Sequence, residues 1–253
     1  MVRRTPAPQL AGHVSSYYGF REDPGTAVRR REGPGTDIVV ILTFEEDWLI
    51  DDERRTSFVG GLRHDQVTTE HPGRSYGMQI NLAPPSAYGL FGVPMHLVAH
   101  RTVPLDDVLD ASFVERVAEA GHWAARFDLL DELLTRRLGE ARRPSAGVSW
   151  AWRRLSETHG RAPVGALAQE LGWSRKRIVA RFREEVGLPP KAVARLFRFE
   201  RARSLAGLRD RPGWAEIALE CGYYDQSHLI NDFRAVTGRT PETFFQDTVR
   251  APA

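Results

Sequence analysis

The sequence of 253 residues contains a single cysteine, Cys221, which excludes an internal disulfide framework. It has no apolar run that approaches the length of about 20 residues needed to cross a membrane as a helix. The first ten residues, MVRRTPAPQL, also lack the apolar stretch of a secretory signal. These absences lead us to expect a cytoplasmic protein that makes no membrane contact.

Charge is unevenly distributed along the chain, although the formal net charge is only +2. Residues 141–253 carry 20 basic and 12 acidic side chains, a net charge of +8. Residues 1–140 carry 15 basic and 21 acidic side chains, a net charge of −6. This asymmetry is expected if only the C-terminal part meets a polyanion. The alternative is that the two parts simply repel different partners.

Short β-like runs, broken by glycine and proline turns, fill the chain from Leu10 to Val108. Many short strands with such turns are typical of a β-barrel or β-sandwich. We therefore expect a β-rich domain with trailing helices over residues 1–140. The candidate strands are Val14–Phe20, Asp37–Phe44, Trp48–Ile50, Thr56–Val59, Tyr76–Leu82 and Met95–Arg101.

Apolar residues recur every three or four positions from Asp110 to Leu138, which predicts two helices separated at Gly121. Their stripe either packs in the core or forms a dimer seam, so a homodimer through residues 112–138 is one alternative. Residues 139–147 are interpreted as a linker to a second domain, residues 141–253. The stripe consists of Phe113, Val117, Ala120, Ala124, Phe127, Leu130, Leu134 and Leu138.

The last third of the chain repeats one pattern. The segment LAQELGWSRKRIVARFREEVGLPP (167–190) is followed by IALECGYYDQSHLINDFRAVTGRTP (217–241). Two similar units of this kind predict two helix-turn-helix motifs and double-stranded DNA as the partner. The shared residues are Leu167, Ala168, Gly172, Phe182, Gly187 and Pro190, which recur as Ile217, Ala218, Gly222, Phe233, Gly238 and Pro241.

Each unit predicts a supporting helix, a glycine turn and a capped recognition helix. In the first unit Gly172 ends the helix 163–171, and Ser174 is placed as the N-cap of the next helix. Asp225 takes the corresponding place after Gly222. The residues expected to face inward are Ile178, Phe182 and Val186 in the first recognition helix, and Leu229, Phe233 and Val236 in the second.

The opposite faces of these two helices are expected to enter major grooves. Gln and Asn can bond adenine, Lys or Arg can bond guanine, and apolar groups can contact thymine methyls. The alternatives are that the arginines contact phosphate and that Val179, Ala180 and Ile230 pack on the helix between the units. The predicted DNA-binding residues are Ser174, Arg175, Lys176, Arg177, Val179, Ala180, Arg181, Arg183, Asp225, Gln226, Ser227, His228, Ile230, Asn231 and Arg234.

A helix predicted over residues 189–207 joins the two units and would span about 25–28 Å at ~1.5 Å per residue. Successive major grooves on one face of DNA lie about 34 Å apart. One chain could therefore place two recognition helices in successive grooves. Because the two helices differ in sequence, the two half-sites would differ as well.

This double motif resembles that of the AraC/XylS-type transcriptional regulators. The resemblance implies an activator or repressor that binds DNA, with RNA polymerase as a partner if it activates. In the first unit the matching residues are Ala168, Gly172, Trp173, Ser174, Phe182, Arg183, Gly187 and Pro190. In the second they are Ile217, Ala218, Gly222, Tyr223, Asp225, Gln226, Ser227, His228, Leu229, Phe233, Arg234, Gly238 and Pro241.

Two positions depart from the family's pattern. Each recognition helix usually carries an arginine two residues before the motif phenylalanine, whereas this chain has Ala180 and Asn231 there. The resemblance therefore implies different base contacts at both positions, with the specificity of the first unit shifted to Lys176 or Arg181. The carboxylate of Asp232 would repel a nearby phosphate.

The N-terminal half is similar, more loosely, to the cupin-like sensor domains that precede this module. Metal-binding cupins present a His-x-His pair, which this sequence lacks. We interpret His64 and His71, and His96 and His100, as scattered surface histidines. The half is therefore expected to bind an unidentified effector, and no metal or cofactor.

The sequence as a whole predicts an α+β protein of two domains: a cupin-like barrel or sandwich, then an all-α domain with two helix-turn-helix units. Catalysis by the first domain is an alternative, but no nucleophile–base pair or phosphate-binding loop supports it, so we predict no enzyme. An adaptor that does not bind DNA is a third alternative, which the basic C-terminal part disfavours.

Overall fold

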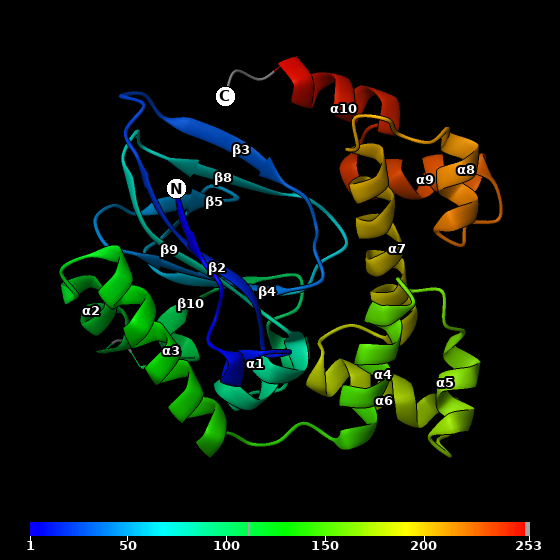
Figure 1. Ribbon diagram of the computed structural model, residues 1–253, viewed down its shortest axis with the longest axis horizontal. Helices are drawn as coiled ribbons and strands as arrows, with labels where there is room; N and C mark the ends of the chain where they lie inside the picture. Colours follow the sequence, from blue (N-terminus) through cyan, green and yellow to red (C-terminus); the bar gives the residue numbers. More distant parts are fainter. Residues whose placement is uncertain (111, 251–253) are drawn as a thin grey trace.

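The computed structural model describes residues 1–110 and 112–250 and has antiparallel sheets followed by helices (Figure 1), which confirms the predicted α+β class. The strands are β1 (Val2–Arg4), β2 (Val14–Glu22), β3 (Val28–Glu32), β4 (Ile38–Thr43), β5 (Trp48–Ile50), β6 (Glu53–Arg55), β7 (Phe58–Gly60), β8 (Val67–His71), β9 (Ser75–Leu82) and β10 (Thr102–Pro104). The α-helices are α1 (Pro84–Phe91), α2 (Ser112–Glu119), α3 (Trp123–Glu140), α4 (Ala146–Glu157), α5 (Val164–Glu170), α6 (Arg175–Glu185), α7 (Pro190–Ala206), α8 (Trp214–Glu220), α9 (Gln226–Thr237) and α10 (Pro241–Arg250). The short 3-10 helices are η1 (Pro8–Leu10), η2 (Met95–Leu97) and η3 (Leu105–Asp107).

Two antiparallel sheets pack against one another in the N-terminal part. The larger sheet has the order β1-β2-β9-β4-β7-β10, and the smaller has the order β3-β8-β5-β6. Phe20, Ile41 and Phe58 of the larger sheet form one buried cluster with Ile50 of the smaller sheet. The described strands thus form a sandwich-like pair of sheets, one of the two predicted architectures, and do not close into a barrel.

Strand β9 shows how the sequence pattern places the two faces of the larger sheet. Met78, Ile80 and Leu82 are buried, and the side chains of Gln79 and Asn81 between them are half-buried. This alternation is the two-residue period of a strand. One face of β9 therefore enters the main core, whereas its other face carries polar groups beside the apolar cluster shared with the smaller sheet.

The predicted strand Met95–Arg101 is wrong. The helix η2 occupies its first three residues, and the strand β10 begins only at Thr102. Met95, Val98 and Ala99 are buried, and their spacing of three and four residues is helical. The period therefore indicated a helical turn rather than a strand.

The predicted helices between residues 110 and 138 are confirmed as α2 and α3, which are separated at Gly121. Helix α3 packs on β2, where the rings of Tyr17 and Phe127 stack at 5.3 Å. Phe127, Leu130 and Leu134 are buried in the main core. Most of the apolar stripe thus packs inside the chain, although Ala124 is exposed. A dimer through residues 112–138 stays a prediction and would use mainly other side chains of these helices.

The main core does not end where the sheets end. One cluster of buried side chains runs from Leu10 of η1 to Phe197 of α7 and includes Val148 of α4 and Phe182 of α6. A separate cluster begins at Ala202 and fills the space between α7, α8 and α9. None of the described helices is long and apolar enough to cross a membrane.

Candidate nucleic-acid interface

The first helix-turn-helix unit consists of α5 and α6 joined by a short turn. Gly172 has a φ of +62°, a left-handed conformation that glycine adopts without strain. The Ser174 hydroxyl accepts a hydrogen bond from the backbone N–H of Arg177 at 3.2 Å and so caps α6. The predicted turn and the predicted cap are both confirmed.

Helix α6 buries one face and exposes the other. The side chains of Ile178, Phe182 and Val186 are fully buried, as their spacing of four residues predicts. Val179 is half-buried, and the guanidinium of Arg177 lies 4.8 Å from the centre of the Trp173 ring. The exposed members of the predicted contact set on α6 are Arg175, Lys176, Arg177, Ala180 and Arg183.

The C-terminal turn of α6 is held by five polar residues, which we call the α6 clamp: Arg181, Glu184, Glu185, Ser145 and Tyr88. Arg181 pairs with Glu184 at 2.9 Å and with Glu185 at 2.5 Å. The fully buried Glu185 carboxylate accepts a hydrogen bond from the Ser145 N–H at 2.7 Å, and Tyr88 of α1 donates to Glu184 at 3.2 Å. The guanidinium of Arg181, which we predicted to contact DNA, is thus engaged by two carboxylates.

Beyond the clamp, α6 ends directly against the N-terminal part. Gly187 has a φ of +101°, and a Cβ at this position would lie 3.0 Å from the Met95 carbonyl oxygen. The sequence did not predict this contact. Glu184 and Glu185 follow Arg181 by three and four residues, a spacing that favours ion pairs along a helix and could have identified the clamp.

The second unit repeats this geometry with α8 and α9. Gly222 has a φ of +75°, and the Asp225 carboxylate accepts a hydrogen bond from the His228 N–H at 2.7 Å. The turn and the cap of the second unit are therefore confirmed as well. The inward residues Leu229, Phe233 and Val236 are buried as predicted.

The outward face of α9 is polar and exposed. Ile230 is half-buried beside it, so the apolar group is only partly available to a partner. The imidazole of His228 stands edge-on to the Tyr223 ring, with ring centres 5.2 Å apart. The other predicted contact residues on this face, all exposed, are Gln226, Ser227, Asn231 and Arg234.

Asp232 does not stand free beside Asn231. Its carboxylate is bonded to the guanidinium of Arg195 on α7 and accepts a hydrogen bond from the Tyr223 hydroxyl at 3.1 Å. Burial and the neighbouring Asp232 raise the pKa of Tyr223, so this phenol stays a donor. The expected repulsion of a phosphate is therefore offset by Arg195, and Asp232 ties α9 to α7.

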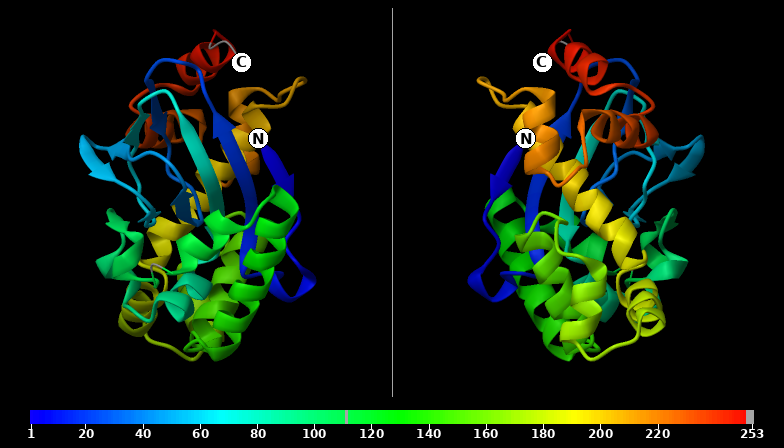
Figure 2. Two further views of the ribbon diagram at one scale, coloured as in Figure 1. Left: turned by 90° about the vertical axis from the view of Figure 1, so that its left-hand side faces the viewer. Right: turned by 90° about the vertical axis from the view of Figure 1, so that its right-hand side faces the viewer.

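Helix α7 separates the two units along its length. The first unit lies at one end of α7 and the second at the other (Figure 1), and the side views agree (Figure 2). Its 17 residues correspond to about 25 Å at ~1.5 Å per residue. This length agrees with the helix predicted between the two units, while the placement in successive grooves stays a prediction.

A cavity of about 700 Å³ lies between the two sheets and extends to the C-terminal helices. Its apolar wall includes Phe20 and Trp48, which come from opposite sheets. Phe199, Glu200 and Arg203 of α7 close its far side, so both parts of the chain contribute to one space. The sequence did not predict which residues would line a ligand site.

Several polar groups of this cavity lack a partner or are perturbed by burial. The indole Nε1 of Trp48 and the hydroxyl of Ser75 are buried without a hydrogen bond. Burial, together with the nearby charge of Glu200, raises the pKa of Asp37 although its carboxylate accepts a hydrogen bond from Ser15. Buried polar groups are rarely left unpaired in native proteins, so these atoms are candidates for ligand contacts.

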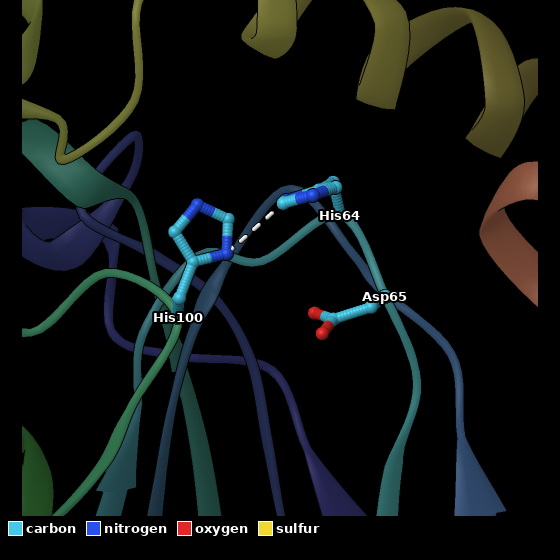
Figure 3. A group of neighbouring side chains, drawn as sticks. All are labelled: His64, Asp65 and His100. Carbon is cyan, nitrogen blue, oxygen red and sulfur yellow. Dashed lines mark hydrogen bonds between the residues drawn. The ribbon is translucent and has the colours of Figure 1, made fainter.

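The histidines of the N-terminal part are not all scattered on the surface, contrary to our interpretation. His71 is buried, and its Nε2 lies 3.4 Å from a carboxylate oxygen of Glu22. The exposed residues His64 and His100 meet with their Nδ1 atoms 3.2 Å apart, and Asp65 lies beside them (Figure 3). The sequence could not show this pairing because the two histidines are separated by 36 residues.

Comparison with known proteins supports the C-terminal motifs and the overall fold. Residues 167–247 match the model of a family described as a helix-turn-helix domain. The chain is similar in structure to ToxT from Vibrio cholerae, with a TM-score of 0.52 and 8% identity over 92% of this chain and 98% of that one. A ToxT structure with an unsaturated fatty acid bound gives a TM-score of 0.50 and 9% identity over 95% and 96% of the two chains.

A shorter similarity is found to the C-terminal domain of AraT, a response regulator from Geobacillus stearothermophilus. Its TM-score is 0.39 and its identity 21%, over 42% of this chain and 88% of that one. A search of curated proteins found no match. The family match confirms the predicted helix-turn-helix domain, and the ToxT similarity shows a shared fold over nearly the whole chain.

Proposed function

We propose that this chain, whose C-terminal part is a helix-turn-helix domain of the AraC/XylS type, is a transcription regulator that binds double-stranded DNA in two successive major grooves. One observation carries the proposal. Helices α6 and α9 each bury one face and expose a polar face beside an N-cap, and they lie at opposite ends of α7.

The two exposed faces differ, so the two half-sites differ. On α6, we assign Lys176 to guanine and Ala180 to a thymine methyl. On α9, we assign Gln226 and Asn231 to adenine. We assign phosphate contacts to the arginines Arg175, Arg177, Arg183 and Arg234. Arg181 is assigned to the α6 clamp instead.

Selection of bound duplexes from a random pool by the full chain tests this function. Two unlike sequence blocks, about one turn of DNA apart, are expected in the selected duplexes. Affinity for the selected duplex should fall steeply with salt, because basic side chains displace counterions from phosphates. A pool that gives no consensus, or an affinity that salt does not change, would contradict the proposal.

Control by the N-terminal part is assigned to the cavity between the sheets. Its apolar wall and the arginines at its edge, Arg30, Arg31 and Arg203, suit an amphipathic ligand with an anionic end. The structurally similar ToxT has been solved with an unsaturated fatty acid bound. A ligand here would touch α7 directly and could bias the placement of the two recognition helices.

Oleate is a suitable probe for this cavity. It should raise the melting temperature of the chain and change its affinity for the selected duplex. Val39→Trp, which fills space in the cavity, should abolish both responses, whereas Val28→Trp outside the lining should retain them. Equal responses of the two variants would place the ligand elsewhere.

A regulator of this kind works in the cytoplasm, and an activator contacts RNA polymerase. Both remain part of the proposal, as does the absence of catalysis. Transcription from a promoter that carries the selected duplex, with and without the chain, distinguishes activation from repression.

A further inference from the structure

Two loops of the N-terminal part lie unusually close together. The loop after β7 and the turn before β10 exchange two backbone hydrogen bonds, from Gly61 N–H to the Arg101 carbonyl at 3.0 Å and from His100 N–H to the Leu62 carbonyl at 2.9 Å. A Cβ at Gly61 would lie only 2.0 Å from the Val98 carbonyl oxygen, so no side chain fits there. The loops therefore hold their outward side chains at a defined separation.

The side chains on these loops converge on one point. The Nδ1 atoms of His64 and His100 are 3.2 Å apart, and their rings are nearly perpendicular, at 87°. Ligand atoms of His64, His100 and Asp65 all lie within 4.8 Å of one another, and Figure 3 shows the two rings turned toward each other above the carboxylate. Two nitrogens bound at 2.0–2.1 Å in a tetrahedral site would be separated by about 3.3 Å.

We propose that His64, His100 and Asp65 form a Zn²⁺ site, with water in the remaining position. Two imidazoles and one carboxylate suit a transition ion such as Zn²⁺, whereas Mg²⁺ and Ca²⁺ prefer oxygen ligands alone. All three side chains are exposed, so an ion has direct access from solvent. Both Nδ1 atoms can bind the ion in place of the hydrogen bond that they share. Each neutral imidazole then carries its proton on Nε2.

The surroundings of the three side chains support the site. Arg63 donates from Nε to Oδ1 of Asp65 at 3.1 Å, which orients the carboxylate and leaves its second oxygen for the ion. His100 has a φ of +61°, a left-handed conformation that is strained for a residue other than glycine. That conformation places the imidazole opposite His64, although an extended backbone would cost less.

The site also lies next to the first recognition helix. Ala99, the neighbour of His100, lies against Gly187 at the end of α6; its Cβ is 3.3 Å from the position that a Gly187 Cβ would take. An ion that joins the two loops would therefore stiffen the segment on which α6 rests. Zn²⁺ binding at these loops does not require DNA, so its absence would leave the proposed DNA binding unaffected.

Calorimetric titration of the full, chelator-treated chain with ZnCl₂ tests the site. We expect one Zn²⁺ per chain, and a loss of affinity greater than about a hundredfold in the variant His64→Gln with His100→Gln, because removal of two direct ligands costs more than loss of an outer-shell partner. His96→Gln is the matched control, because His96 is exposed on η2 four residues from His100 and outside the group. Undiminished binding by the double variant, or an equal loss in His96→Gln, overturns the assignment.

A second measurement on the unaltered chain keeps the proposal testable if the double variant does not fold. Titration with Zn²⁺ should shift the imidazole nitrogen resonances of His64 and His100 and leave those of His96 in place. Co²⁺ in place of Zn²⁺ should give the intense visible absorption of a four-coordinate ion. MgCl₂ should produce neither effect. Shifts confined to other histidines would overturn the site.

Discussion

Asn231 and Arg183 are exposed at different places in the proposed interface. Their substitution by alanine should therefore affect DNA binding in different ways. Asn231→Ala removes a base contact, so discrimination at one base pair of the second half-site should fall by about 1–3 kcal/mol. Arg183→Ala removes a phosphate contact, so affinity for all duplexes should fall alike. Competition binding over single-base variants of the selected duplex measures both effects. Gln169→Ala, an exposed amide on α5, should change neither quantity.

Cys221 should not react in the folded protein at neutral pH. Its side chain is fully buried, and this burial raises the pKa of the thiol to about 11, from an ordinary value of 9.0. The folded state therefore holds the proton more tightly than the unfolded chain does. The stability that this group contributes is complete below about pH 9 and is lost as the pH rises toward 11.

Two measurements check this expectation. A disulfide reagent that titrates thiols should label the native chain slowly at pH 8 and stoichiometrically in urea. Urea unfolding of the unaltered chain should show falling stability between about pH 9 and pH 11, and Cys221→Ala should show a smaller fall over that range. Rapid labelling of the native chain would show that the thiol is accessible and ionised.

At the scale of elements, Asp232 joins α9 to α7 through Arg195 and Tyr223. Asp232→Ala leaves a guanidinium and a phenol without their acceptor, so we expect a loss of about 1–3 kcal/mol in the free energy of unfolding. Urea denaturation measures this loss. The same variant should weaken binding through the second half-site more than through the first. Asp210→Ala, at an exposed position between α7 and α8, is the control and should leave both unchanged.

The helix-turn-helix elements could be predicted because their signals are local. A glycine at each turn, a capping side chain two or three residues later, and buried residues three or four apart on each recognition helix lie within about 15 positions of one another. The bounds of α7 agree with the prediction within one residue, and α6 and α9 begin directly after the predicted caps Ser174 and Asp225.

Other elements carried no such signal. Helix α1 buries seven of its eight residues and therefore shows no amphipathic period. Strand β3 pairs with β8 through a largely exposed, charged segment that lacks the alternation typical of a strand. The meeting of His64 with His100 depends on the pairing of β7 with β10. The α6 clamp likewise depends on how α1 and the segment 141–145 fold back on α6.

At the scale of the whole molecule, the clamp couples the first recognition helix to the N-terminal part. Glu185→Ala should lower the free energy of unfolding by about 2–3 kcal/mol, because it removes charged hydrogen bonds at a fully buried position. Glu185→Gln should cost less, since the amide oxygen can still accept from the Ser145 N–H. Amide hydrogen exchange should accelerate in α6 of the alanine variant. Glu170→Ala, at an exposed position on α5, is the reference variant. An equal loss of stability in that variant would show that the clamp does not stabilise α6.

The buried cluster that crosses residue 140 bears on how the chain can be divided. A protease that cuts the segment 141–145 would not release two stable fragments, because Val148 and Phe182 pack in the same core as Tyr88 and Met95. We expect residues 141–253, expressed alone, to retain a folded second unit and a loosened first one. The place at which the molecule separates most readily then lies inside α7, between Phe197 and Ala202. In such a motion α6 would stay fixed to the two sheets, and only α9 would change its position relative to them.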